Sequence, residues 1–351
     1  MIVHSKNKNY EVHMVMNLDW LKEDSRDRFY VLDRKVYEIY KTKLFCSLPK
    51  DRIYLIDALE ENKTINVALD ICKAMTEMPS RRNTRLISIG GGIIQDVTGF
   101  AANILYRGIG WIFVPTTLLS ACDSCIGGKT SLNYDKFKNL LGTFYPPDEI
   151  YICSSLFKTL EERDFLSGLG EVVKFNVMGG ETQLASMEKD MPELLQRNPE
   201  KLVPYVKSSL EFKKNIIEED EFDKGSRVLL NYGHTFGHAI EAVTDYVVPH
   251  GTAVAMGMIV ANRISLYRGM ISEALALRIE KLIKKIVPFY GNKFELRGKE
   301  LESAIHKDKK QTDSNITAIL INDNMDLEIV HNIKIVEIEN GTGYLMEFLA
   351  E

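Results

Sequence analysis

The sequence has few cysteines, no long apolar run and no strong excess of one charge. Five cysteines occur among 351 residues, a sparse, odd-numbered set typical of reduced thiols in the cytoplasm rather than a secreted disulfide framework. The longest apolar stretch, residues 253–261, is too short to cross a bilayer, and residues 1–13 lack the apolar segment of a signal peptide. Lys and Arg number 44 against 49 Asp and Glu, so the broad positive field of a nucleic-acid-binding protein is missing. We therefore expect a cytoplasmic protein whose partner is neither a membrane nor nucleic acid.

What is present is the composition of a globular protein of about two domains. Hydrophobic residues make up 45% and charged residues 26%, which excludes a disordered or collagenous chain. Before residue 155, short β-type runs such as 28–32, 85–89 and 111–114 alternate with helical segments. This alternation is typical of a mainly parallel sheet covered by helices. We predict an α/β domain over residues 1–155.

The pattern changes near residue 160, after which helical periodicity dominates. Residues 251–267 and 272–286 are the clearest helical segments, and the β-type runs 316–321 and 327–330 predict a small hairpin. We therefore predict a mainly helical domain over residues 156–351.

Two glycine-rich segments lie in the first of these domains. Gly90–Gly92 follow a predicted strand and precede a helix, so they can bring the backbone close to a phosphate, although GGGxxxD is not the GxGxxG fingerprint. Residues 123–130, DSCIGGKT, lack the first glycine of a P-loop because Asp123 stands there. Lys129 can still meet a phosphate, and Asp123 can accept from a hydroxyl. The lone CxxC of Cys122 and Cys125 indicates two small buried residues rather than a zinc site.

Residues 226–243 read as one amphipathic helix with a polar stripe. At about 100° per residue, five polar side chains fall within an arc of roughly 80°: Arg227, Asn231, His234, His238 and Glu241. A solvent-exposed face is the ordinary explanation of such a stripe, but that face favours Lys and Glu. Gly233 and Gly237 are also unfavourable in a helix interior and indicate a close approach of another backbone. We therefore interpret the stripe as functional.

Further candidate groups flank this stripe. Glu171 and Lys174 share a helix face at spacing i, i+3, and His250 precedes a long apolar helix. One Glu and two His form a recurrent catalytic zinc set with an open coordination position. The spacing does not decide whether His234 or His238 is a ligand, and HTFGH lacks the internal Glu of a HExxH protease. The other four histidines are not flanked by such candidate groups, and we expect them to be structural or on the surface: His4, His13, His306 and His331.

Nine ordered motifs between residues 85 and 262 resemble those of the 3-dehydroquinate synthase family, the sugar-phosphate cyclases: GGGIIQDVTGFAA, YRG, VPTTLL, DSCIGGKTSLN, KNLLGTFY, FKTLEERD, GLGEVVK, RVLLNYGHTFGHAIE and HGTAVAMGM. The resemblance implies an N-terminal, Rossmann-like NAD-binding α/β domain and a mainly α-helical, metal-binding C-terminal domain. It also implies a homodimer with its active site in the cleft.

The resemblance assigns site residues by position. It implies that Glu171, His234 and His250 bind a divalent metal, Zn2+ or Co2+, and that His238 contacts substrate. The implied NAD-binding residues are Asp33, Glu60, Lys63, Gly91, Gly92, Asp96, Thr116, Thr117, Asp123, Lys129, Lys138, Leu156 and Thr159, with Asp123 and Lys129 where nicotinamide meets substrate. The implied catalytic and substrate-binding residues are Asp123, Lys129, Asn139, Lys174, Lys213, Arg227, Asn231, His238, Lys309 and Arg107.

Within that set, Lys213 and Arg227 resemble the pair that binds a carboxylate. Lys129, Asn139, Asn231 and His238 resemble the phosphate-binding set, together with a late lysine, Lys309 in preference to Lys310. Arg107 resembles an arginine that reaches the phosphate from the other subunit.

The implied substrate is a small sugar phosphate that carries a carboxylate. The implied reaction converts 3-deoxy-D-arabino-heptulosonate 7-phosphate to 3-dehydroquinate and phosphate through transient oxidation by NAD, elimination, reduction and aldol closure. The alternatives are a 2-deoxy-scyllo-inosose or 2-epi-5-epi-valiolone synthase, a metal-dependent glycerol or alcohol dehydrogenase, or a non-enzymatic binding protein. Among these alternatives, two pairs of residues favour the seven-carbon keto acid phosphate as substrate: Asn231 with His238, and Lys213 with Arg227. Two departures lie on the NAD side: Gln95, where the family commonly has Gly, and Leu59, where it has Gly before Glu.

Overall fold

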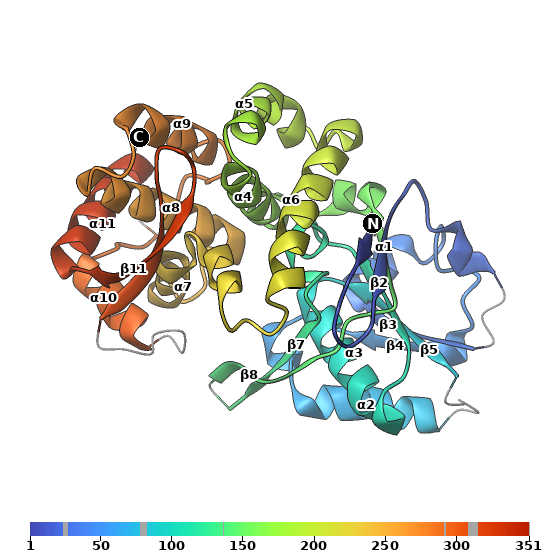
Figure 1. The fold of residues 1–351 in the computed structure, drawn as a ribbon. Helices are drawn as coiled ribbons and strands as arrows, with labels where there is room; N and C mark the ends of the chain where they lie inside the picture. Colours follow the sequence, from blue (N-terminus) through green and yellow to red (C-terminus); the bar gives the residue numbers. More distant parts are fainter. Residues whose placement is uncertain (24–26, 78–82, 136, 291–292, 308–314, 351) are drawn as a thin grey trace. The chain divides into compact units, whose positions relative to one another are not determined.

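The chain forms two compact units (Figure 1). The computed structural model describes residues 1–23, 27–77, 83–135, 137–290, 293–307 and 315–350. The first unit comprises Met1–Leu160 with Lys214–Phe222, and the second comprises Glu161–Lys213 with Asp223–Glu351. Helix α6 (Pro199–Glu219) therefore begins in the second unit and ends in the first.

The segment Lys214–Phe222 belongs to the first unit because it binds the N-terminal loop. The backbone N–H of His4 donates to Glu218 at 2.6 Å, and that of Lys6 donates to Glu221 at 2.7 Å. The predicted boundary at residue 155 does not account for this segment, which comes back to the first unit from later in the chain. Its partners lie more than 200 residues away, and such a distant pairing leaves no local signal in the sequence.

The first unit is built on a seven-stranded sheet. Its order is β1 (Ile2–Val3), β2 (Tyr10–Val15), β9 (Glu149–Cys153), β6 (Trp111–Pro115), β5 (Arg85–Gly90), β3 (Arg28–Asp33) and β4 (Ile53–Ile56). All neighbouring pairs are parallel except β1 with β2. The central strands β5 and β6 are almost entirely buried, as expected for a parallel sheet covered on both faces. The predicted parallel α/β architecture is confirmed.

Helices α1 (Arg34–Tyr40), α2 (Ile65–Thr76) and α3 (Gly92–Ile104) follow strands β3, β4 and β5. Strands β2 and β9 were not predicted, and neither was the antiparallel hairpin of β7 (Lys129–Tyr134) and β8 (Phe137–Phe144). Most of β8 is exposed, so its sequence carries no clear alternation of buried and exposed positions.

The second unit is mainly helical. It contains α4 (Glu162–Met178), α5 (Glu181–Leu195), α7 (His234–Val243), α8 (His250–Tyr267), α9 (Glu273–Ile283), α10 (Gly298–Lys307) and α11 (Ile335–Ala350). Helix α8 is buried on nearly all sides and packs against α4, α7 and α11, which explains its apolar sequence. The predicted late hairpin is confirmed as the antiparallel pair β10 (Ile316–Ile321) and β11 (Leu327–Ile333).

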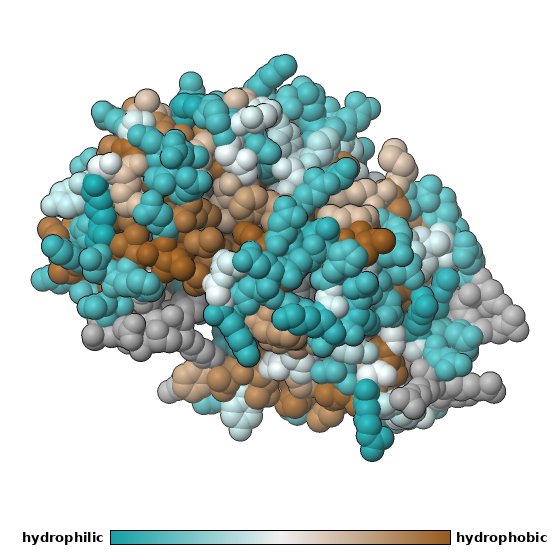
Figure 2. Space-filling model, viewed as in Figure 1, coloured by the Kyte–Doolittle hydropathy of each residue, from teal (hydrophilic) through white to brown (hydrophobic). Residues whose placement is uncertain are grey.

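The face drawn in Figure 2 is mostly hydrophilic, with smaller apolar patches between the polar residues. Within the described part of the chain, no helix combines the length and the apolarity needed to span a bilayer.

Candidate functional site

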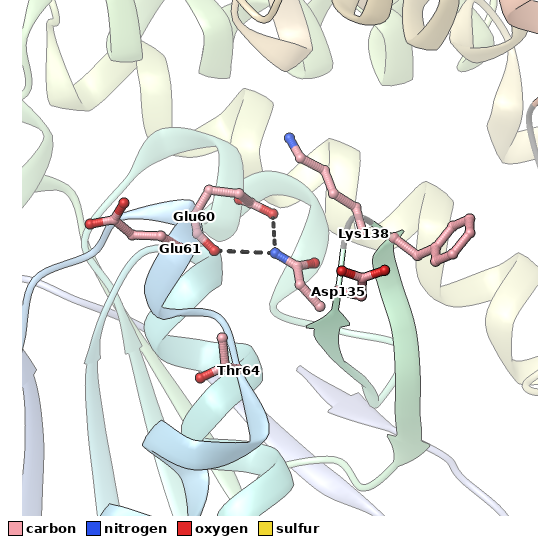
Figure 3. Close-up of a pocket in the computed structure, with 7 residues that line it drawn as sticks. Glu60, Glu61, Thr64, Asp135 and Lys138 are labelled. Carbon is pink, nitrogen blue, oxygen red and sulfur yellow. Dashed lines mark hydrogen bonds between the residues drawn. The ribbon is translucent and has the colours of Figure 1, made fainter.

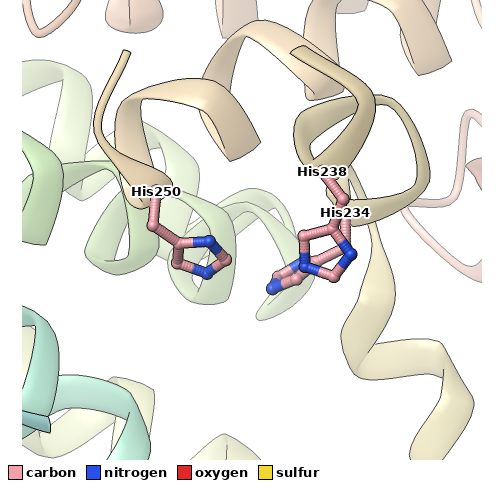
Figure 4. Close-up of side chains that lie close together, drawn as sticks. All are labelled: His234, His238 and His250. Carbon is pink, nitrogen blue, oxygen red and sulfur yellow. The ribbon is translucent and has the colours of Figure 1, made fainter. Parts of the chain in front are cut away.

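Three histidines and a glutamate converge in the second unit. His234 and His238 lie on α7 and His250 begins α8 (Figure 4), and each ring offers a nitrogen within 4.8 Å of the others. Glu171 Oε1, from α4, lies 3.5 Å from Nε2 of both His234 and His250. The Glu171 side chain is fully buried. The four groups therefore surround one point where three helices meet.

Hydrogen bonds at the far side of two rings orient them toward Glu171. His250 Nδ1 lies 2.9 Å from Oε2 of Glu241, and His234 Nδ1 lies 3.2 Å from the carbonyl oxygen of Tyr232. Because a carbonyl only accepts, Nδ1 of His234 is the donor, and the carboxylate imposes the same tautomer on His250. In the neutral rings this leaves both Nε2 lone pairs directed at Glu171, as in metal-binding histidines.

The charges around Glu171 favour a cation at this point. Burial by itself disfavours a charged His250, but the Glu171 and Glu241 carboxylates outweigh it and raise the pKa of His250 to about 10. Lys174 is also buried and places its Nζ 2.6 Å from Glu171 Oε2 and 3.1 Å from the carbonyl oxygen of Leu230. Lys174 thus holds one carboxylate oxygen while the other faces the two histidines.

Glycines allow the three helices to approach this closely. A Cβ built on Gly170 of α4 would lie 2.0 Å from the carbonyl oxygen of Gly251 on α8. A Cβ on Gly257 of α8 would lie 2.1 Å from the carbonyl oxygen of Gly233, just before α7. The close approach expected at Gly233 and Gly237 is confirmed, since a Cβ on Gly237 would lie 2.9 Å from Cα of Val254.

The single helix predicted over residues 226–243 is wrong. Residues Ser226–Asn231 form a 3-10 helix, and the chain then turns at Tyr232 and Gly233, whose φ is +76°. A glycine adopts this left-handed conformation without a steric penalty. Arg227 and Asn231 therefore do not share an α-helical face with His234 and His238, and the common arc does not exist. Arg227 on this turn and Lys213 on α6 are both largely buried.

In the first unit, Lys63, Asp96 and Asn139 form one polar network. Lys63 Nζ lies 2.6 Å from Asp96 Oδ2 and donates to Asn139 Oδ1 at 2.6 Å. Ser131 donates to Asp96 through its backbone N–H and its hydroxyl, both at 3.0 Å. Burial raises the pKa of Asp96, and the Lys63 ammonium and the Ser131 donors oppose this rise.

A small pocket of about 260 Å³ lies beside this network (Figure 3). Its lining comprises Glu60, Glu61, Thr64, Asn133, Asp135, Phe137 and Lys138, and it therefore contains two of the residues expected to bind NAD, Glu60 and Lys138. Asn133 Nδ2 donates to Glu60 Oε1 at 2.8 Å, which fixes that carboxylate at the pocket wall.

The other residues expected to bind NAD follow the carboxyl ends of parallel strands. Asp33 ends β3, and its side chain caps α1 by accepting from the N–H of Lys35 at 2.9 Å. Gly91 and Gly92 follow β5, Thr116 and Thr117 follow β6, and Leu156 and Thr159 follow β9. Ligands of open α/β sheets bind at this edge. Asp123 lies in a short π-helical segment, Ser120–Ser124, and Lys129 is the first residue of β7.

Arg107 is not part of either cluster. It is exposed at the end of a short 3-10 segment, Leu105–Arg107, that follows α3, and its φ is +65°. The 13 residues of α3 span about 20 Å from Gly91. Lys309 and Lys310 lie outside the described residues. Cys122 and Cys125 are buried and form no disulfide.

Glu241 was part of the predicted stripe but had no assigned role. The sequence does not connect it with His250, because their contact depends on how the chain turns between α7 and α8. Gln95 likewise appeared only as a departure from the family, yet it exchanges two hydrogen bonds with Ser124.

Comparison with known proteins identifies the family. Two models of 3-dehydroquinate synthase match, the N-terminal one over residues 53–167 and the C-terminal one over residues 168–311. The 3-dehydroquinate synthase of Clostridium tetani is 36% identical over 329 residues, which cover 90% of this chain and 87% of that protein.

Two solved structures have the same fold. The 2-epi-5-epi-valiolone synthase ValA of Streptomyces hygroscopicus subsp. jinggangensis, with NAD+ and Zn2+ bound, has a TM-score of 0.85 at 23% identity and covers 99% of both chains. A 2-deoxy-scyllo-inosose synthase complexed with carbaglucose-6-phosphate, NAD+ and Co2+ also has a TM-score of 0.85, at 22% identity, with 97% of this chain and 99% of that chain covered. On its match to both family models and its similarity to the clostridial enzyme, this chain belongs to the 3-dehydroquinate synthase family.

Proposed function

We propose that this protein is a phosphate-eliminating cyclase with 3-dehydroquinate synthase activity, dependent on NAD and a divalent metal. It converts 3-deoxy-D-arabino-heptulosonate 7-phosphate to 3-dehydroquinate and phosphate. The observation that carries the proposal is the position of Glu171 Oε1, 3.5 Å from Nε2 of both His234 and His250, in a chain 36% identical to a 3-dehydroquinate synthase.

The side chains around Glu171 fit a divalent metal. One carboxylate oxygen and two imidazole nitrogens are the donor set of catalytic zinc sites, and the partners of Nδ1 in His234 and His250 select the tautomer that such a site requires. When bound, the metal supplies positive charge that stabilises an oxygen anion on the substrate. We assign Glu171, His234 and His250 as ligands. His238, the third ring of the cluster, contacts substrate, and Lys174 orients Glu171.

The first unit fits NAD. The turn at Gly91 leads into a 13-residue helix whose first N–H groups receive no side-chain cap, and such an end favours a pyrophosphate. Glu60, with its carboxylate fixed by Asn133, and Lys63, paired with Asp96, flank this edge of the sheet. NAD held by these residues would accept a hydride from the carbon that bears a substrate hydroxyl and later return it, so it would not be consumed.

The charged ends of the substrate require cations and amide donors. Arg227 and Lys213 are assigned to the carboxylate, and their burial limits the side-chain motion that binding must arrest. Asn139 Oδ1 accepts from Lys63 and Ser131, so Nδ2 is the part of this amide proposed to donate to the phosphate. Asn231, His238, Lys129 and Lys309 complete the proposed phosphate set. Held at both ends, the substrate keeps one reactive geometry through several steps.

The protein is proposed to act as a homodimer in the cytoplasm. Arg107 is exposed just beyond α3, and the family resemblance assigns it to the phosphate bound by the other subunit. None of the five cysteines forms a disulfide, which suits a reducing compartment. Analytical ultracentrifugation tests the dimer.

Incubation with 3-deoxy-D-arabino-heptulosonate 7-phosphate, NAD and Zn2+ or Co2+ tests the proposed activity. We expect phosphate release and 3-dehydroquinate identified by NMR. Product from a sugar phosphate without a carboxylate, with none from the keto acid, would instead assign the chain to a sister cyclase. Net NADH release with glycerol would favour a dehydrogenase.

A further inference from the structure

Two consecutive residues of α3 bind the two ends of one loop. Gln95 binds Ser124, which directly follows Asp123, and Asp96 binds Ser131, two residues after Lys129. The loop between these contacts thus joins the two residues proposed to lie where nicotinamide meets substrate. The same helix begins at the Gly91 turn proposed to bind the pyrophosphate of NAD.

The contact between Gln95 and Ser124 is reciprocal. Gln95 Nε2 donates to the backbone carbonyl oxygen of Ser124 at 2.7 Å, and Ser124 Oγ donates to Gln95 Oε1 at 2.7 Å. Gln95 is only 3% exposed and both hydrogen bonds are partly buried, so losing them would leave the buried amide of Gln95 without these partners. A glycine, the residue common in the family at this position, could make neither bond.

We propose that Gln95 is a positioning residue that fixes Asp123 relative to the NAD-binding turn. Gln95 holds the backbone one residue after Asp123, while Asp96 anchors β7 just after Lys129. The Gln95 contact ties the first end of the loop to α3. This inference rests on the proposed function for the roles of Asp123 and NAD, but the contact itself does not.

The inference predicts a specific kinetic effect for Gln95→Leu, which keeps much of the bulk and removes both hydrogen bonds. We expect kcat to fall about tenfold, as for the loss of one well-placed contact in a reactive geometry, while the NAD dissociation constant changes less than about threefold. The primary deuterium isotope effect, measured with substrate deuterated at the oxidised carbon, should rise because hydride transfer becomes slower. A purely structural role would lower stability without changing the isotope effect.

Hydrogen–deuterium exchange provides a readout that does not depend on turnover. In Gln95→Leu, amides of residues 121–130 should exchange faster, while the exposed control Gln196→Leu should leave exchange and kcat unchanged. If Gln95→Leu does not fold, Ser124→Ala, which removes one of the two bonds, should show the same effects at smaller size. Gln95→Gly should behave like Gln95→Leu.

Unchanged exchange at residues 121–130 together with unchanged kcat in these variants would overturn the inference. A wild-type protein that releases no phosphate from any of the sugar phosphates would refute the proposed function instead. In that case faster exchange in Gln95→Leu, with wild-type exchange in Gln196→Leu, would still establish the contact as the anchor of the loop.

Discussion

Glu241 Oε2 lies 2.9 Å from Nδ1 of His250, on the side of the ring opposite the nitrogen that faces Glu171. A carboxylate in this position fixes the tautomer of a metal-binding histidine and increases its basicity. The contact joins the second half of α7 to the first residue of α8.

We therefore predict that Glu241→Gln weakens metal binding by 10- to 100-fold, the usual effect of losing such a partner. Competition with a chromophoric chelator measures this directly. Glu347→Gln changes the same functional group at an exposed position of α11 and should bind metal like the wild type. Equal affinity in the two variants would show that His250 does not need its carboxylate partner.

The three histidines should separate into two classes. His234→Ala and His250→Ala, like Glu171→Ala, should abolish both metal binding and turnover, because each removes a proposed ligand. His238→Ala should retain the metal and lose turnover, because its role is proposed to be toward substrate. Metal content, measured by mass spectrometry, and a phosphate-release assay distinguish the two classes. Loss of metal from His238→Ala, with metal retained in His234→Ala, would exchange the two assignments.

Arg227→Ala should act mainly on substrates that carry a carboxylate. A hydrogen bond to a charged group contributes about 1.5–3 kcal/mol, so kcat/KM for the keto acid phosphate should fall roughly 10- to 150-fold. A sugar phosphate without the carboxylate, if turned over at all, should lose much less. The same loss on both substrates would argue for a structural role of this buried arginine.

Gly170→Ala should destabilise the second unit, because the added methyl would lie 2.0 Å from the carbonyl oxygen of Gly251. Overpacking of this kind costs about 1–3 kcal/mol, and the shift of α4 should also weaken metal binding by moving Glu171 away from His250. Urea unfolding and chelator competition measure the two effects.

Gly343→Ala is the matched control for this substitution. It lies within α11 with nothing within 4 Å of the added Cβ, and it should raise the free energy of unfolding by about 0.5–1 kcal/mol through helix propensity. If Gly170→Ala were equally harmless, the close helix crossing would not be needed at the site.

Much of this molecule follows from local sequence. The buried runs of β3, β5 and β6 predicted the parallel sheet, and the helical periodicity of α8 and α9 predicted the helical second unit. Both signals exist because residues buried on a regular element recur at a fixed spacing in the sequence. The ordered motifs likewise predicted the family. The role of each candidate residue stays a prediction that the variants above test.

Tertiary packing decided the rest. The chain breaks at Gly233, whose φ is +76° and which packs closely against Val254 and Met258 of α8. The periodicity of residues 226–243 does not predict that contact. The contacts of Glu241 with His250 and of Gln95 with Ser124 likewise join residues whose nearness depends on how separate segments pack. The sequence by itself determined which groups are available and which elements carry them. Only the packing of those elements decided which nitrogens face Glu171 and which residues hold them there, since a side chain's partners depend on distances through space that a local pattern does not encode.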